Sequence, residues 1–300
     1  MEEGLNAHSI KDLENFAGIK AHTIRIWEKR HAILSPDRTD SNIRTYSESE
    51  LKKILNVVYL NNRGYKISKI AKLNEEELAK KVIEISKRSY SKIEDSSYDR
   101  ILSPVSDFDE GKLRAGIASL IAKYDFETAY RKHIYLLMER ARIMWQTESF
   151  SRSQMQFVGS VVKNIIIAES ALLKPKTQDN APCVAMVNVS NNMADNNFLF
   201  YKYVLTKRGF NVIYPGGILP AAEAFEIYMI KPFEYAVINS SSFDFAGNKL
   251  AYFQNIGRSL MLKKIIFTDF FDTETTQSEE VLQYCATPSD FIKAVDAIQC

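Results

Sequence analysis

The chain has 300 residues, of which 46% are hydrophobic, enough for two or three domains that each bury a core. No apolar run reaches the roughly 18 residues of a membrane span, and the charged first 20 residues contain no signal-like apolar stretch. We therefore expect a cytoplasmic protein. Cys183, Cys285 and Cys300 lack the spacing of a zinc site or a disulfide framework, so no metal site is expected.

The net charge of +2 is unevenly distributed along the chain. Residues 11–72 contain 13 Lys and Arg against 7 Asp and Glu, which gives +6, and the remainder has 26 against 30, which gives −4. A basic N-terminal quarter favours a nucleic-acid partner, although many basic surfaces bind nothing.

Two short helices are predicted before residue 32. The run from Ser9 to Asp12 fits a capping box, and Gly18 stands where a helix ends on a left-handed residue. A second helix is expected from Ala21 to about His31, with Ile24 and Trp27 on one inward face. This order predicts a helix-turn-helix, whose second helix lies in the major groove of DNA.

A short hairpin is predicted next. Residues 33–38 and 42–46 are expected to pair as strands around a tip at Asp40-Ser41, which would form a wing. Ser47 to Glu50 matches a second capping box, which opens a helix that ends near Gly64. A further short helix is expected at about residues 66–73.

The run TIRIWEKRHAILSPDRTDSNIRTYSESEL resembles the winged-helix DNA-binding domain of the MerR family of bacterial regulators, over roughly residues 8–75. The resemblance implies that the second helix enters the major groove, that the wing contacts flanking phosphates, and that two later residues meet the backbone further out. The implied contacts are His22, Thr23, Arg25, Lys29 and Arg30 on the helix, Arg38, Arg44 and Tyr46 on the wing, and Arg63 and Lys66 beyond it. Trp27 is expected in the core, and Glu28 is expected to pair with a basic residue one turn away.

The rest of the chain predicts two further domains and two linkers. The first domain is expected at residues 1–85, and the polar, serine-rich residues 86–100 are interpreted as a linker. Apolar residues at helical spacing predict a four-helix bundle at residues 101–174. After a second linker at residues 175–181, short apolar runs alternate with amphipathic helices through residues 182–300. That alternation predicts an α/β domain with a parallel sheet of five strands in flavodoxin-like order.

This order of domains resembles the cobalamin-dependent photoreceptor repressors of the CarH and LitR type. In that family a bundle Trp is followed, nine residues later, by Glu-His; here Trp145 is followed by Met155 and Gln156. The family's Asp-x-His-x-x-Gly loop supplies the imidazole below cobalt, but Asp195 has no histidine two residues on. Ser240, Ser241 and Ser242 stand where the family cradles the corrin tail. None of the four histidines follows position 133, so a degenerate site and no cofactor are expected.

The sequence thus predicts a multidomain protein with an all-α winged helix-turn-helix domain, a four-helix bundle and a flavodoxin-like, cobalamin-binding-like α/β domain. The expected function is that of a MerR-type transcriptional regulator, at least dimeric, that binds double-stranded promoter DNA, with repression favoured. An alternative is a DNA-binding sensor whose rear domains bind another small molecule or a protein partner. No GxGxxG or GxxxxGK loop and no nucleophile–base pair is apparent, so an enzyme is not expected.

Overall fold

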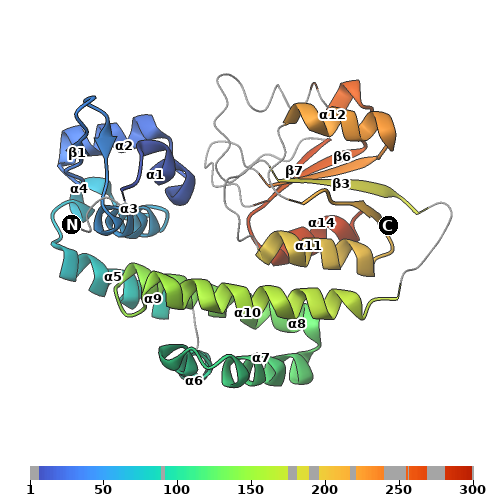
Figure 1. Ribbon diagram of the computed structural model, residues 1–300, viewed down its shortest axis with the longest axis horizontal. Coiled ribbons are helices and arrows are strands. Elements are labelled where there is room, and N and C mark those ends of the chain that lie inside the picture. Colours follow the sequence, from blue (N-terminus) through green and yellow to red (C-terminus); the bar gives the residue numbers. More distant parts are fainter. Residues whose placement is uncertain are drawn as a thin grey trace. The chain divides into compact units, whose positions relative to one another are not determined.

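The computed structural model describes residues 7–88, 92–174, 181–188, 196–216, 221–239, 255, 257–268 and 281–298. The chain divides into two compact units, Met1–Val161 and Val162–Cys300. The division falls within a single long helix, α10 (Arg152–Ala171) (Figure 1).

The first unit begins with helices and a hairpin in the order that the sequence predicts, but the hairpin strands are shorter than the expected residues 33–38 and 42–46. They are α1 (Ile10–Ala17), α2 (Ala21–His31), β1 (Asp37–Arg38), β2 (Arg44–Thr45), α3 (Glu48–Asn61) and α4 (Ile67–Ile70). The Ser9 hydroxyl accepts the Asp12 N–H, and the Asp12 carboxylate accepts the Ser9 N–H, which starts α1. Gly18 ends α1 with a φ of 67°, a left-handed conformation that favours glycine.

The chain before α1 is joined to the base of the wing. His8 and Tyr46 form an antiparallel bridge, in which the His8 N–H donates to the Tyr46 carbonyl at 2.7 Å and the Tyr46 N–H donates to the His8 carbonyl at 2.9 Å. A second capping box, between Ser47 and Glu50, starts α3, whose Leu51 is wholly buried. The base of the wing is therefore joined to the chain before α1 and leads directly into α3.

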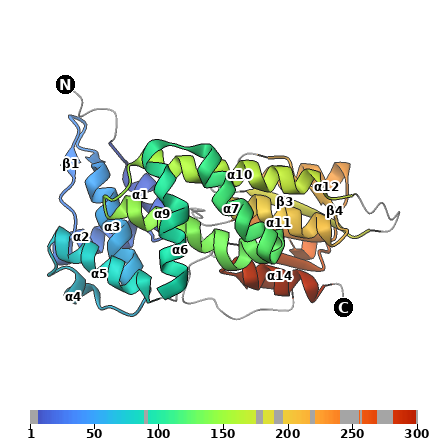
Figure 2. The same ribbon diagram turned by 90° about the horizontal axis from the view of Figure 1, so that it is seen from below.

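The remainder of the first unit is helical. Its elements are α5 (Glu75–Lys87), α6 (Lys92–Leu102), η1 (Ser103–Asp107), α7 (Glu110–Tyr124), α8 (Phe126–Ala129), η2 (Tyr130–Ile134), α9 (Tyr135–Gln146) and the first part of α10. The predicted helical bundle is confirmed, with α6, α7, the continuous run α8–α9, and α10 as its helices (Figure 2).

The predicted linker at residues 86–100 is wrong. Ser86 and Lys87 belong to α5, and residues 92–100 belong to α6. Tyr98 and Leu102, four residues apart on one face of α6, are each only 1% exposed. α6 also contains Ile93 and Ile101, but its first part is polar and serine-rich, so local patterns do not reveal the buried face at Tyr98 and Leu102.

A π-helical turn, η2, lies inside the run from α8 to α9. The Tyr135 N–H donates to the Tyr130 carbonyl, five residues back. His133 is buried in this turn, with its Nδ1 at 3.0 Å from the Tyr98 hydroxyl and its ring stacked on Tyr124 at 4.5 Å between centroids. The buried imidazole is therefore held by aromatic neighbours from α6 and α7.

The second unit contains a parallel sheet of β3 (Cys183–Asn188), β4 (Asn211–Ile213), β5 (Tyr235–Asn239), β6 (Lys264–Thr268) and β7 (Leu282–Cys285). The order is β4-β3-β5-β6-β7, and each neighbouring pair is parallel. Numbered along the chain this is 2-1-3-4-5, so the predicted flavodoxin-like sheet is confirmed.

Helices cover both faces of this sheet (Figure 1). On one face lie α11 (Asn196–Lys207) and α14 (Pro288–Asp296), which contact each other, with Tyr201 stacked on Phe291 at 4.1 Å between ring centroids. On the other face α12 (Ala221–Ile230) contributes Ile227 to a core that includes Val187 and Ile265. Among the described residues, no helix is both long and apolar enough to cross a membrane.

Candidate DNA interface

Helix α2 has one buried side chain and a cationic outer face. Ile24 is wholly buried and fixes which side of α2 faces inward. The residues of α2 that the resemblance implies as DNA contacts lie outward: His22, Arg25, Lys29 and Arg30 are exposed, and Thr23 is partly exposed. Trp27, expected in the core, is only partly buried. The geometry of α2 therefore suits a helix that presents cations to a polyanion.

The wing is a tight hairpin that carries Arg38 near its tip. The Thr39 N–H donates to the Ile43 carbonyl at 2.9 Å, and Asp40 and Ser41 form the predicted turn. Arg38 is exposed, and its Nη1 donates to Asn42 Oδ1 at 2.6 Å across the turn. The guanidinium is thus held at the surface of the hairpin, where a phosphate could reach it.

Glu28 joins α2 to the wing. Arg44 Nε donates to Glu28 Oε1 at 3.1 Å, and the Tyr46 hydroxyl donates to Glu28 Oε2 at 3.3 Å. The side chains of Glu28 and Arg44 are 16% and 32% exposed. Glu28 therefore pairs with the wing and not, as the sequence suggested, with a basic residue one turn away on its own helix.

Tyr46 differs from its expected role as a phosphate contact. Its side chain is buried, with 1% exposure, so it supports the wing from below. Burial, with the nearby negative charge of Glu28, raises the pKa of Tyr46 to about 12. The hydroxyl is consequently protonated at neutral pH and available as a donor to Glu28.

The two outer residues, Arg63 and Lys66, are exposed on the segment between α3 and α4. Arg63 is held in place because its Nη1 donates to the Tyr59 carbonyl at 3.1 Å and its guanidinium lies 3.5 Å from the centroid of the Tyr59 ring. Lys66 precedes the first residue of α4. Lys69 in α4 and Lys72 just after it are also exposed, and the sequence reasoning did not single them out.

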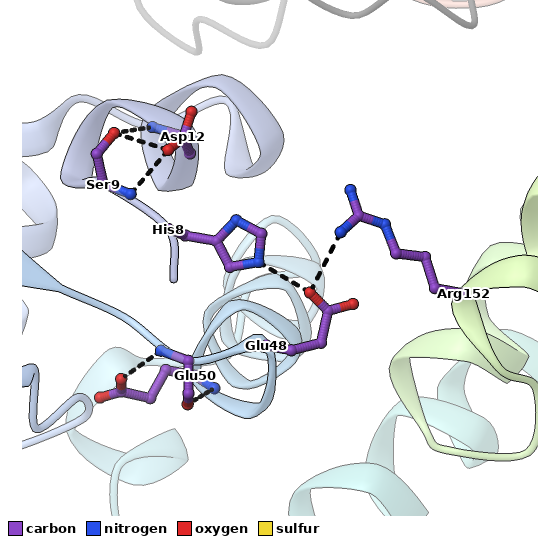
Figure 3. A network of polar contacts seen from close by, with 7 residues as sticks. His8, Ser9, Asp12, Glu48, Glu50 and Arg152 are labelled. Carbon is purple, nitrogen blue, oxygen red and sulfur yellow. Dashed lines mark hydrogen bonds and ion pairs between the residues drawn. The ribbon is translucent and has the colours of Figure 1, made fainter. Parts of the chain in front are cut away.

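A polar network connects α3 to the residues around the start of α10 (Figure 3). Glu48 Oε2 accepts from His8 Nε2 at 2.8 Å and lies 3.6 Å from Arg152 Nη1. Further along α3, Asn56 Nδ2 donates to the Gln146 carbonyl at 3.2 Å. These contacts join residues that are 40 positions apart for His8 and Glu48 and 90 or more for the other two pairs, which local sequence patterns do not reveal. They connect the helix that follows the wing directly to the bundle.

The residues of the expected degenerate cofactor site fall into two groups. Trp145 is buried in α9, whereas Met155 is partly exposed and Gln156 is exposed on α10. Asp195, Ser240, Ser241 and Ser242 lie outside the described residues.

The donor set does not fit a corrinoid held by an imidazole. No histidine follows position 133 in the sequence, so the α/β unit contains none. His133 itself lies in the first unit, buried against Tyr98 and Tyr124. Methionine and asparagine are poor replacements for an imidazole at cobalt, so no residue described here supplies the expected lower ligand.

Comparison with known proteins settles the family of the N-terminal part. Residues 8–77, which run from the bridge at His8 into α5, match the MerR HTH family regulatory protein model. This part of the chain is a MerR-type helix-turn-helix domain. The HTH-type transcriptional repressor CarH of Myxococcus xanthus is 35% identical to the chain over 57 residues, which are 19% of each protein. The match thus spans about a fifth of the length of that curated relative.

Solved structures are similar in fold to about two thirds of the chain. The monomethylamine corrinoid protein of Methanosarcina barkeri has a TM-score of 0.52 at 11% identity, over 68% of this chain and 99% of its own. A cobalamin-binding protein of Desulfitobacterium hafniense has a TM-score of 0.33 at 14% identity, over 67% of this chain and 97% of its own. The first similarity concerns the fold alone. Together with the MerR-type domain, it confirms the predicted CarH-like order of parts.

Proposed function

We propose that this protein is a sequence-specific, DNA-binding transcriptional regulator. The observation that carries the proposal is the exposed cationic face of α2, with Arg25 and Lys29, beside the exposed Arg38 of the wing in a MerR-type domain. Cations at these positions would release counterions from the phosphate backbone, and α2 would read base edges in the major groove.

We also propose a homodimer that binds an inverted repeat, because one helix-turn-helix reads only a few base pairs. Repression is favoured by the curated relative, which is named a repressor. The protein would act in the cytoplasm and without enzymatic activity. Light scattering of the protein on its DNA checks the oligomeric state, and a monomer on a two-fold repeat would contradict the proposed dimer.

Replacing Arg25 by alanine is the test of the proposed interface. The DNA is a duplex that the wild-type protein selects from a randomised pool. Loss of a base contact should weaken binding by about 5-fold to 150-fold at fixed salt, which corresponds to about 1–3 kcal/mol. Fluorescence anisotropy measures the dissociation constant.

Arg114→Ala is the matched control, because it removes the same charge from α7, outside the MerR-type domain. It should leave the affinity within about twofold of the wild type, since a surface change away from special features has little effect. Equal affinities for Arg25→Ala and Arg114→Ala, with both proteins folded, would contradict the proposed orientation of α2.

We further propose that regulation does not use cobalamin, because the α/β unit offers no imidazole. Protein mixed with adenosylcobalamin in the dark and then desalted is expected to show no corrin absorption. A stoichiometric corrin spectrum that changes on illumination would contradict this proposal. A second candidate function, in which the rear domains bind another small molecule or a protein, keeps the same DNA-binding role.

A further inference from the structure

Glu28 is an anion on the helix that faces a polyanion in the proposed function. Its neighbours along α2 include Arg25 and Lys29, both exposed cations. A carboxylate near phosphates repels them, so Coulomb's law alone gives Glu28 an unfavourable role in DNA binding. The structure nevertheless turns both of its oxygens toward the wing, where each accepts one hydrogen bond.

The partners of Glu28 come from two positions of the wing strand that follows the tip. Arg44 donates from Nε, which is one of the five N–H donors of a guanidinium. Its side chain is 32% exposed, so part of the guanidinium still faces solvent. Glu28 thus accepts from the Nε–H of Arg44, and the four N–H groups on Nη1 and Nη2 remain for another acceptor.

Tyr46 supplies the second hydrogen bond to Glu28 and is itself buried. It is 1% exposed, and its hydroxyl donates to Glu28 Oε2 at 3.3 Å. Its backbone N–H and its carbonyl both form hydrogen bonds with the backbone of His8. Its position, directly after the strand that carries Arg44, holds the carboxylate between a buried phenol and a half-exposed guanidinium. The negative charge and the low exposure of Glu28 make these charge-assisted hydrogen bonds stronger than neutral ones.

We propose that Glu28 is a positioning residue for DNA binding, which orients Arg44 and the wing relative to α2 so that Arg44 meets a backbone phosphate. This proposal rests on the proposed function and goes beyond it, because it assigns a favourable role to an anion in the interface. Holding the guanidinium before DNA arrives lowers the entropy that Arg44 loses on binding.

Positioning and simple electrostatics predict opposite signs for Glu28→Gln. Removing a negative charge beside DNA should strengthen binding if Glu28 acts only through its charge. Glutamine replaces one of the two carboxylate oxygens by an NH2 group that only donates, so it cannot accept from Arg44 and Tyr46 at the two separate positions that Glu28 uses. If Glu28 positions the wing, the same substitution weakens binding although it makes the surface more positive.

The experiment compares the wild type, Glu28→Gln, Arg44→Met and the double variant on the duplex that the wild type selects. We expect Glu28→Gln to weaken binding by about tenfold and the double variant to bind no more weakly than Arg44→Met, because coupled residues are not additive. Equal or tighter binding by Glu28→Gln, or additive effects in the double variant, would overturn the proposal.

The salt dependence separates positioning from a loss of fold. Loss of one phosphate contact reduces the slope of log K against log salt by about one unit, so Glu28→Gln should show the same reduced slope as Arg44→Met. A variant that melts early but retains the wild-type slope would show a merely structural role and overturn the proposal. Tyr46→Phe removes one donor and leaves the ion pair intact, so it should give a smaller loss of affinity with an unchanged charge.

The experiment also distinguishes failure of the proposed DNA-binding function from failure of the Glu28 proposal. A wild-type protein that selects no duplex removes the DNA-binding role and the Glu28 proposal with it. A wild-type protein that selects a duplex, and an Arg25→Ala variant that binds it weakly, retain the proposed function whatever Glu28→Gln does.

Discussion

Replacement of Ile24 by alanine is expected to lower the free energy of unfolding of the first unit by about 2–5 kcal/mol. Ile24 is wholly buried and is the buried residue of α2, so the truncation removes apolar contact and leaves a cavity beneath α2. Because small domains are stable by only about 5–15 kcal/mol, DNA binding should fall with stability. Urea unfolding followed by tryptophan fluorescence measures the change, since both tryptophans lie within Met1–Val161.

Ile26→Ala is the matched control, because it makes the same chemical change two positions away on a partly exposed side of α2. A smaller loss of stability is expected there, since less apolar surface returns to water. If the two variants unfold at the same urea concentration, the inward face of α2 is not the one described above.

Replacement of Phe291 by alanine is expected to destabilise the second unit by about 3–5 kcal/mol. Phe291 is wholly buried on α14 and stacks on Tyr201 of α11, which is also wholly buried. The substitution removes both the buried ring and its aromatic partner contact, which joins the two helices on one face of the sheet. Circular dichroism during urea unfolding measures the loss.

Phe225→Ala provides the comparison for this second prediction. Phe225 lies on α12 and is 53% exposed, so the same substitution there should change stability by no more than about 0.5 kcal/mol. A Phe291→Ala protein that unfolds like Phe225→Ala would contradict the proposed packing of α14 on α11.

The N-terminal elements were predictable because their signals are local. The capping boxes at Ser9 and Ser47 each act within four residues, and Gly18 marks the end of α1 by its own backbone preference. The α/β unit was predictable for a related reason, because buried parallel strands leave short, continuous apolar runs such as that of β3. These local signals do not depend on how the rest of the chain folds.

The remainder depended on contacts that local patterns do not encode. Glu28 has basic neighbours along α2, so helical spacing favoured a partner there, yet the hairpin brings Arg44 closer. Tyr46 was assigned a surface role by resemblance, but the bridge to His8 and the packing beneath the wing bury it. In α6 the buried Tyr98 and Leu102 follow a polar, serine-rich run that favoured a linker. In each case tertiary structure decided a choice that sequence left open.

The π-helical turn η2 determines how α9 is rotated about the helix axis relative to α8. A residue of an α-helix turns by about 100° relative to the one before it, and a bond across five residues accommodates one residue more than the regular ladder. Deleting one residue between Tyr130 and Ile134 would restore an unbroken α-helix. It would also rotate Trp145, now buried in α9, by that angle relative to Phe126, now buried in α8. The π-helical turn therefore allows Phe126 in α8 and Trp145 in α9 to be buried together. In a regular α-helix, one of these two side chains would turn toward solvent.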